Sequence, residues 1–135
     1  MKKYVLMMMS CMALVLAACG GGGSSSESSS GDRFSGGQTI TTLGESENAP
    51  FVMTIDGNTV TVVDEDFTAS GELNGNNFTV NVPAFSFTED GITCTFNIAY
   101  SGSLISETMT SGSISGSVSC DGIDFPVTGT FSANR

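Results

Sequence analysis

Four short turn signals divide the chain from about residue 49 onward into segments in which apolar and polar residues alternate. Asp56-Gly57, Asn74-Gly75, Asp90-Gly91 and Asp121-Gly122 each supply residue types that adopt the positive φ angles of hairpin turns. Between the turns, apolar residues fall on every second position, as a half-buried strand requires, and no window has a helical period. Residues 49–135 therefore predict an all-β, antiparallel domain.

Each turn also predicts which residues of its two strands lie opposite one another. A two-residue loop at Asp56-Gly57 places Met53 opposite Val60, with both on the apolar face. The other hairpins pair residues of the apolar face in the same way: Leu73 with Phe78, Phe87 with Cys94, Phe85 with Phe96, Val118 with Phe125, and Gly116 with Val127. Because a slip of one residue would mix the two faces, these registers favour an up-and-down meander that curls into a small sheet or barrel.

The number of strands depends on two places where the inward-facing residues change between even and odd sequence numbers. Asp64-Glu65-Asp66 lies at the first and Pro83-Ala84 at the second. If both are tight turns, the meander has eight strands, whereas two bulges in long bent strands give six. The sequence leaves both alternatives open, and it leaves open whether the sheet closes.

Two cysteines fall within the β domain, and the predicted register places Cys94 opposite Cys120. A non-hydrogen-bonded antiparallel pair has Cα atoms about 4.5 Å apart, which suits a disulfide. A redox-active pair is disfavoured because the chain has no Cys-x-x-Cys motif. We therefore predict a structural disulfide between these two cysteines.

The N-terminal segment has the features of an export signal. Lys2 and Lys3 precede an apolar run over residues 4–18, which is short for a membrane span. Leu16-Ala17-Ala18-Cys19 follows and resembles the lipobox of bacterial lipoproteins. The resemblance implies a signal peptide over residues 1–18 and lipid, including palmitate, on Cys19, which would anchor the protein in the membrane. The alternative is an ordinary signal peptide with a chance cysteine.

The residue after the lipidated cysteine helps to sort lipoproteins between membranes, and here it is Gly20. By the same resemblance, a residue other than Asp implies the outer membrane of the bacterial envelope. The Gly/Ser-rich stretch that follows cannot bury apolar area, and residues 32–48 are polar and weakly patterned. We therefore expect a lipidated tether over residues 19–48.

The mature chain is strongly acidic. After loss of residues 1–18, Arg33 and Arg135 remain against fourteen Asp and Glu residues, which leaves a net charge of −12. Such a charge disfavours nucleic acid and anionic lipid surfaces as partners. Residues at or near the turns are candidates for an acidic interaction patch: Asp64, Asp66, Glu89, Asp90, Asp121 and Asp124.

No catalytic site is evident in the sequence. The chain has no histidine, which excludes Ser-His-Asp and Cys-His nucleophile systems and the usual zinc sites. Asp64-Glu65-Asp66 lacks the spacing of an EF-hand, so a solvated turn is favoured over a calcium site. We therefore predict a protein without a metal, a cofactor or an enzymatic activity.

The β domain is similar in size, export and single disulfide to small lipocalin-like lipoproteins of the bacterial envelope. This resemblance and the acidic surface favour a non-enzymatic domain that binds a protein or a small apolar ligand. The alternative is an inhibitor of a cationic hydrolase such as lysozyme, for which the negative charge would provide electrostatic steering.

Overall fold

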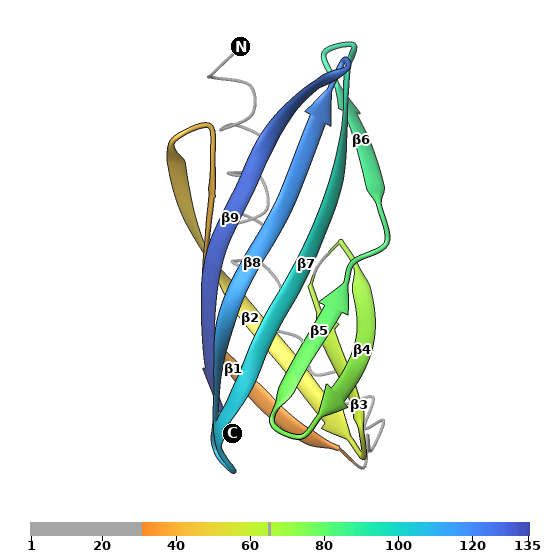
Figure 1. The fold of residues 1–135 in the computed structure, drawn as a ribbon. Coiled ribbons are helices and arrows are strands. Elements are labelled where there is room, and N and C mark those ends of the chain that lie inside the picture. The colour runs from red at the N-terminus through yellow and green to blue at the C-terminus, as the bar shows by residue number, and fades with distance from the viewer. Residues whose placement is uncertain (1–30, 65) are drawn as a thin grey trace, which may run out of the picture. The chain divides into compact units, whose positions relative to one another are not determined.

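The chain folds into nine strands in the computed structural model, which describes residues 31–64 and 66–135 (Figure 1). The strands are β1 (Asp32–Thr42), β2 (Glu45–Asp56), β3 (Thr59–Val63), β4 (Thr68–Asn74), β5 (Asn77–Asn81), β6 (Phe85–Glu89), β7 (Ile92–Ser106), β8 (Met109–Cys120) and β9 (Ile123–Asn134). In these ranges no helix is long and apolar enough to cross a membrane. The all-β prediction is confirmed.

Eight of the nine strands form a closed antiparallel barrel. Consecutive strands pair from β1 to β5 and from β7 to β9, and the ring closes through the pairs β1–β9 and β5–β7. β6 pairs with β7 and with no other strand of the described chain. The predicted meander therefore closes into a barrel, and β6 is one additional strand beside it.

The two parity changes have different causes. Asp64 and Phe67 lie between the antiparallel strands β3 and β4, and the Asp64 N–H donates to the Phe67 carbonyl at 2.9 Å. By contrast, β5 and β6 lie one after the other along β7, and Pro83 and Ala84 between them face the single residue Asn97. The first site is a tight turn and the second is a bulge, so each alternative applies once.

The predicted registers hold in three of the four hairpins. In the hairpin of β2 and β3 the prediction is wrong by two residues, because the loop is Gly57-Asn58 and Met53 lies opposite Val62. Only Gly57 has a positive φ there, 58°, while Asp56 remains in the strand. A shift of two residues preserves the faces, so Met53, Val60 and Val62 are all buried.

The domain begins earlier than the sequence predicts. Residues 32–48, expected to extend the tether, form β1 and the first part of β2. The turn between these strands consists of Leu43 and Gly44, with φ angles of 55° and 81°. A positive φ is unusual for leucine, so this turn gives no signal in the sequence. The start of the barrel is therefore corrected from residue 49 to Asp32, while residues 1–18, Cys19 and residues 20–30 lie outside the described part.

Aromatic rings fill the part of the barrel that is closed on all sides. The Phe51 and Phe131 rings stack with centroids 4.5 Å apart, and Tyr100 is fully buried beside them. Gly102 and Gly112 leave the space for these rings, since a Cβ at either position would lie 2.6 Å from the Phe131 ring. Residues 31–135 form one compact unit with this core, so we expect the segment to fold by itself.

The predicted disulfide is present. Cys94 and Cys120 lie directly opposite one another on β7 and β8, with Cα atoms 4.1 Å apart and a disulfide between their side chains. The Asp121 N–H donates to the Thr93 carbonyl at 3.2 Å. Thr93 and Asp121 are therefore a hydrogen-bonded pair, which makes the neighbouring cysteines a non-hydrogen-bonded pair, as predicted.

Candidate binding site

The barrel wall is incomplete along part of its length. β3 covers only Val52–Asp56 of β2, so residues 45–51 of β2 pair with β1 alone. On the other side of this interruption, β6 pairs with β7 alone among the described strands. Figure 1 shows the β1–β2 hairpin and β6 on opposite sides of the upper part of the barrel. We call this part, bounded by β6 and residues 45–51, the open half, and the remainder the closed half.

The inner face of the open half is apolar and partly accessible. Phe85 and Phe96 stack with centroids 5.2 Å apart, with Phe87 and Phe67 against them at 5.5 and 5.9 Å. Seven apolar side chains of this region pack against the core but remain half-buried: Ile40, Phe67, Phe85, Phe87, Ile92, Phe96 and Phe125. The open half therefore presents an aromatic surface of the kind that binds apolar groups.

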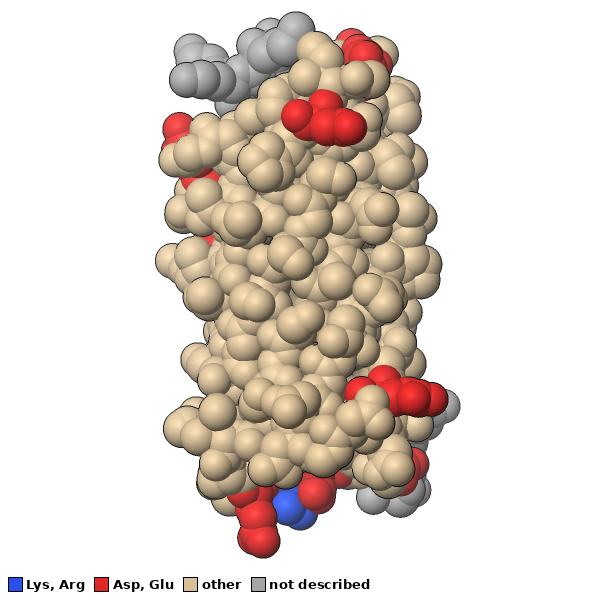
Figure 2. Space-filling view, in the orientation of Figure 1, with Lys and Arg blue, Asp and Glu red and all other residues tan. Residues whose placement is uncertain are grey.

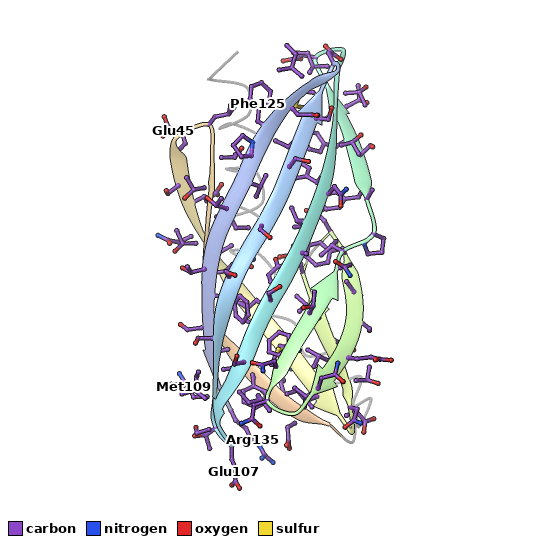
Figure 3. The ribbon with its side chains drawn as sticks, in the orientation of Figure 1. Glu45, Glu107, Met109, Phe125 and Arg135 are labelled. Carbon is purple, nitrogen blue, oxygen red and sulfur yellow. A yellow bond between two sulfur atoms is a disulfide. The ribbon has the colours of Figure 1, made fainter. Side chains whose placement is uncertain are left out.

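Carboxylates lie on the β2 side of the same inner face. Glu45 and Glu47 precede Phe51 on β2 by an even number of residues, so they lie on the same face as Phe51, which points into the barrel. Glu47 is half-buried, and this burial raises the pKa of its carboxyl group above the ordinary value. Figure 3 shows Glu45 and Phe125 at the same end of the barrel. The open half thus combines an aromatic side with an acidic side.

The basic residues of the barrel lie at the opposite end. Arg33 and Arg135 are the basic residues in the sequence from residue 31 onward. Arg135 forms an ion pair with Asp32 at 2.5 Å, and Figure 3 places Arg135 beside the β7–β8 turn, at the end remote from Glu45. The carboxylates of the open half therefore face no Lys or Arg among the described residues.

A buried polar chain crosses the barrel where the two halves meet. The Tyr100 hydroxyl donates to Gln38 Oε1 at 2.9 Å, and Gln38 Nε2 donates to Asp64 Oδ2 at 3.3 Å. Burial, and secondarily the Asp64 charge, raise the pKa of Tyr100 far above its ordinary value, although the bond to Gln38 acts in the opposite direction. The Tyr100 hydroxyl therefore stays protonated and serves as a hydrogen-bond donor at the boundary between the two halves.

We expect Gln38→Leu to lower the free energy of unfolding by about 1–3 kcal/mol, because it leaves the Tyr100 hydroxyl buried without its acceptor. In the double variant Gln38→Leu with Tyr100→Phe the loss should be smaller than the sum of the two single losses, since no unpaired hydroxyl remains. Urea unfolding of the four proteins measures both quantities. Strict additivity would show that the two side chains do not depend on each other.

The predicted acidic residues occupy several separate places. Asp90 and Asp121 begin the two turns at the end of the open half, and Asp124 follows on β9. Asp64 and Asp66 lie in the β3–β4 turn, where burial and the neighbouring Asp64 charge raise the pKa of Asp66. The side chain of Glu89 lies outside the described part. A function of these residues as an interaction patch stays a prediction.

The outer wall of the barrel is hydroxyl-rich. A shallow depression over β5, β7 and β8 is lined mainly by small polar side chains: Asn77, Thr79, Ser101, Ser103, Ser111 and Ser113. Figure 2 shows that the middle of this face carries no charged side chain, while acidic residues lie toward its ends. Within residues 31–64 and 66–135, no three acidic or cysteine side chains are placed to hold a metal ion.

The fold and the site define a small antiparallel barrel that is filled in one half and open in the other. No protein-family model and no curated protein sequence matches the chain. A solved structure of a vaccine-antigen variant of transferrin binding protein B from Haemophilus parasuis is similar, with a TM-score of 0.49 and 14% sequence identity. The match covers 76% of this chain but only 25% of that structure, so it carries no conclusion about function.

Proposed function

We propose that this protein is a lipid-anchored lipoprotein of the bacterial envelope whose open half binds an apolar ligand, or an apolar part of a partner protein, without catalysis. The observation that carries the proposal is the aromatic inner face. Its half-buried phenylalanines lie beside the gap between β6 and residues 45–51 of β2, where no described strand pairs with either edge. Exposed apolar surface of this kind is a feature of binding sites.

The connection to the anchor supports this assignment. The chain that carries Cys19 enters the barrel at Asp32, which forms an ion pair with Arg135 at the end of the closed half. The turn at Leu43 and Gly44 and the turn at Asp121 and Gly122 lie at the other end. A tether that carries the anchor would therefore join the barrel at the end remote from the open half.

The polar groups of the open half are better suited to binding than to catalysis. The Tyr100 hydroxyl is already engaged in a hydrogen bond to Gln38. The chain offers no histidine as a general base. The pKa of the Glu47 carboxyl group is raised by burial. Binding by apolar contact requires none of these groups to transfer a proton.

We expect the chain from Gly20 onward to bind the neutral fluorescent probe N-phenylnaphthylamine, and Phe87→Asp to weaken this binding by about tenfold or more, because it removes apolar contact area and buries a charge. Ser86→Asp is the matched control, since it adds the same charge to the outer face of the same strand. Fluorescence titration measures both affinities. Absence of probe binding to the unmodified chain would contradict the proposal.

The hydrolase-inhibitor alternative rests on Asp90 and Asp121, which lie on neighbouring turns at the exposed end of the barrel. It predicts inhibition of lysozyme that weakens sharply as salt rises, because steering between opposite charges is screened. The double variant Asp90→Asn with Asp121→Asn should then lose most of the inhibition. An unchanged rate of cell-wall hydrolysis at low salt would exclude this alternative.

A further inference from the structure

The free edge of β6 carries backbone groups that are aimed into the interruption of the wall. Cys94 and Cys120 form a non-hydrogen-bonded pair, so the N–H and C=O of Cys94 point toward β6, where they meet Phe87. The N–H and C=O groups of Ser86 and Thr88 must then point away from β7. These groups are presented to the gap between β6 and β2.

The side chains of β6 alternate in the way that strand addition requires. Phe85 and Phe87 point to the inner face and are half-buried, while Ser86 and Thr88 are exposed on the outer face. An extended segment added beside β6 would place every second side chain against these phenylalanines. The edge therefore offers both backbone hydrogen bonds and an apolar surface.

The charge around the gap defines the partner further. Glu45 and Glu47 lie on the β2 side, Asp64 and Asp66 lie in the β3–β4 turn, and Asp90 follows the end of β6. Since the arginines of the barrel are at its other end, the gap has one sign of charge. A basic segment is attracted to it, whereas a second copy of this chain would bring like charges together.

We propose that the open half binds an extended peptide segment of a partner protein, with alternating apolar and basic residues, which adds as a strand to the free edge of β6 between β6 and residues 45–51 of β2. This inference rests on the proposed function of the open half as a binding site. The backbone of β6 supplies the hydrogen bonds, Phe85 and Phe87 contact the apolar side chains, and the surrounding carboxylates attract the basic ones.

The probe is a synthetic seven-residue peptide of alternating valine and lysine, titrated calorimetrically into the chain from Gly20 onward. Two control peptides separate the contributions. A valine and glutamate peptide keeps the strand pattern but reverses the charge, and a valine and lysine peptide with alternate backbone amides methylated keeps the side chains but loses the edge hydrogen bonds. We expect each control to bind at least about tenfold more weakly than the probe.

Paired variants locate the site. Thr88→Pro removes an N–H at the free edge and should reduce affinity about tenfold, while Thr88→Ala, which keeps that N–H, should leave it within about twofold. Glu47→Gln should weaken binding and reduce its salt dependence, whereas Glu72→Gln, an exposed change on β4, should have no effect. Retention of the disulfide and of β circular dichroism confirms that each variant is folded.

Failure of this inference can be distinguished from failure of the proposed function. In one outcome N-phenylnaphthylamine binds and Phe87→Asp abolishes its binding, but the methylated peptide binds as tightly as the unmethylated one. The open half is then a binding site without strand addition. Equal affinity for the lysine and glutamate peptides would overturn the charge assignment. If neither N-phenylnaphthylamine nor the valine and lysine peptide binds, both proposals fail together.

Discussion

Replacing Cys94 and Cys120 together by alanine should lower the free energy of unfolding of the barrel by about 3.5 kcal/mol. The two residues are separated by 26 positions, and the chain-entropy estimate for a loop of this length gives that value. A loss of this size is a large share of the stability of a domain of about 100 residues. It should lower the melting temperature by about 15 °C.

Urea unfolding of the oxidised protein, the reduced protein and the double alanine variant measures this effect. Because the bridge joins β7 and β8 directly opposite one another, reduction and double substitution should give similar losses. Ser115→Ala, an exposed change on β8, is the control and should change the stability by less than about 0.5 kcal/mol. A loss below about 1 kcal/mol on reduction would show that the bridge does not restrict the unfolded chain.

The second large effect concerns the anchor. We expect Cys19→Ser to abolish lipid attachment, so that the protein moves completely from the membrane fraction to the soluble fraction or remains as an uncut precursor. Two or more acyl chains are needed for stable anchoring, and the variant would carry none. Radiolabelled palmitate and cell fractionation follow the two outcomes.

Cys11→Ser is the matched control for the anchor prediction. Cys11 lies within the apolar run of residues 4–18, so its substitution should leave both palmitate labelling and membrane association unchanged. Palmitate that persists in Cys19→Ser, or disappears in Cys11→Ser, would contradict the interpretation of Leu16-Ala17-Ala18-Cys19 as a lipobox.

The hairpins could be predicted from the sequence because their determinants are local. Asp90-Gly91 and Asp121-Gly122 have positive φ at both positions, as their residue types indicate, and they fix the registers on either side. The disulfide followed from the same registers. At the β2–β3 hairpin only Gly57 has a positive φ, so the loop lies one residue further on than predicted and the predicted register is wrong by two.

The first strand could not be predicted because its signals are weak. Its inward positions include Gln38 and Thr42, which are buried but polar, and its turn uses Leu43 at a positive φ. A hydrophobic pattern does not detect such a strand. Closure of the barrel depends on the pairings of β1 with β9 and of β5 with β7, which join distant segments and have no local signature.

The candidate site was missed for a related reason. Ile40, Glu45 and Glu47 belong to residues 32–48, whose weak hydrophobic pattern predicts a tether, so no local signal places them across the gap from Phe85 and Phe87. Some of the acidic residues predicted at the turns lie around this site, and two of its phenylalanines, Phe85 and Phe87, come from β6. That strand is separated from β5 only by the bulge at Pro83-Ala84, which the sequence could not distinguish from a turn.

Amide hydrogen exchange of β6 in the chain from Gly20 onward tests most directly whether the wall of the barrel is open at this strand. The N–H of Phe87 points to β7 and should be protected, whereas those of Ser86 and Thr88 point into the gap and should exchange far faster. Nuclear magnetic resonance resolves the three amides individually. Equal protection of Ser86, Phe87 and Thr88 would mean that β6 has a partner on both sides, and would contradict an open half.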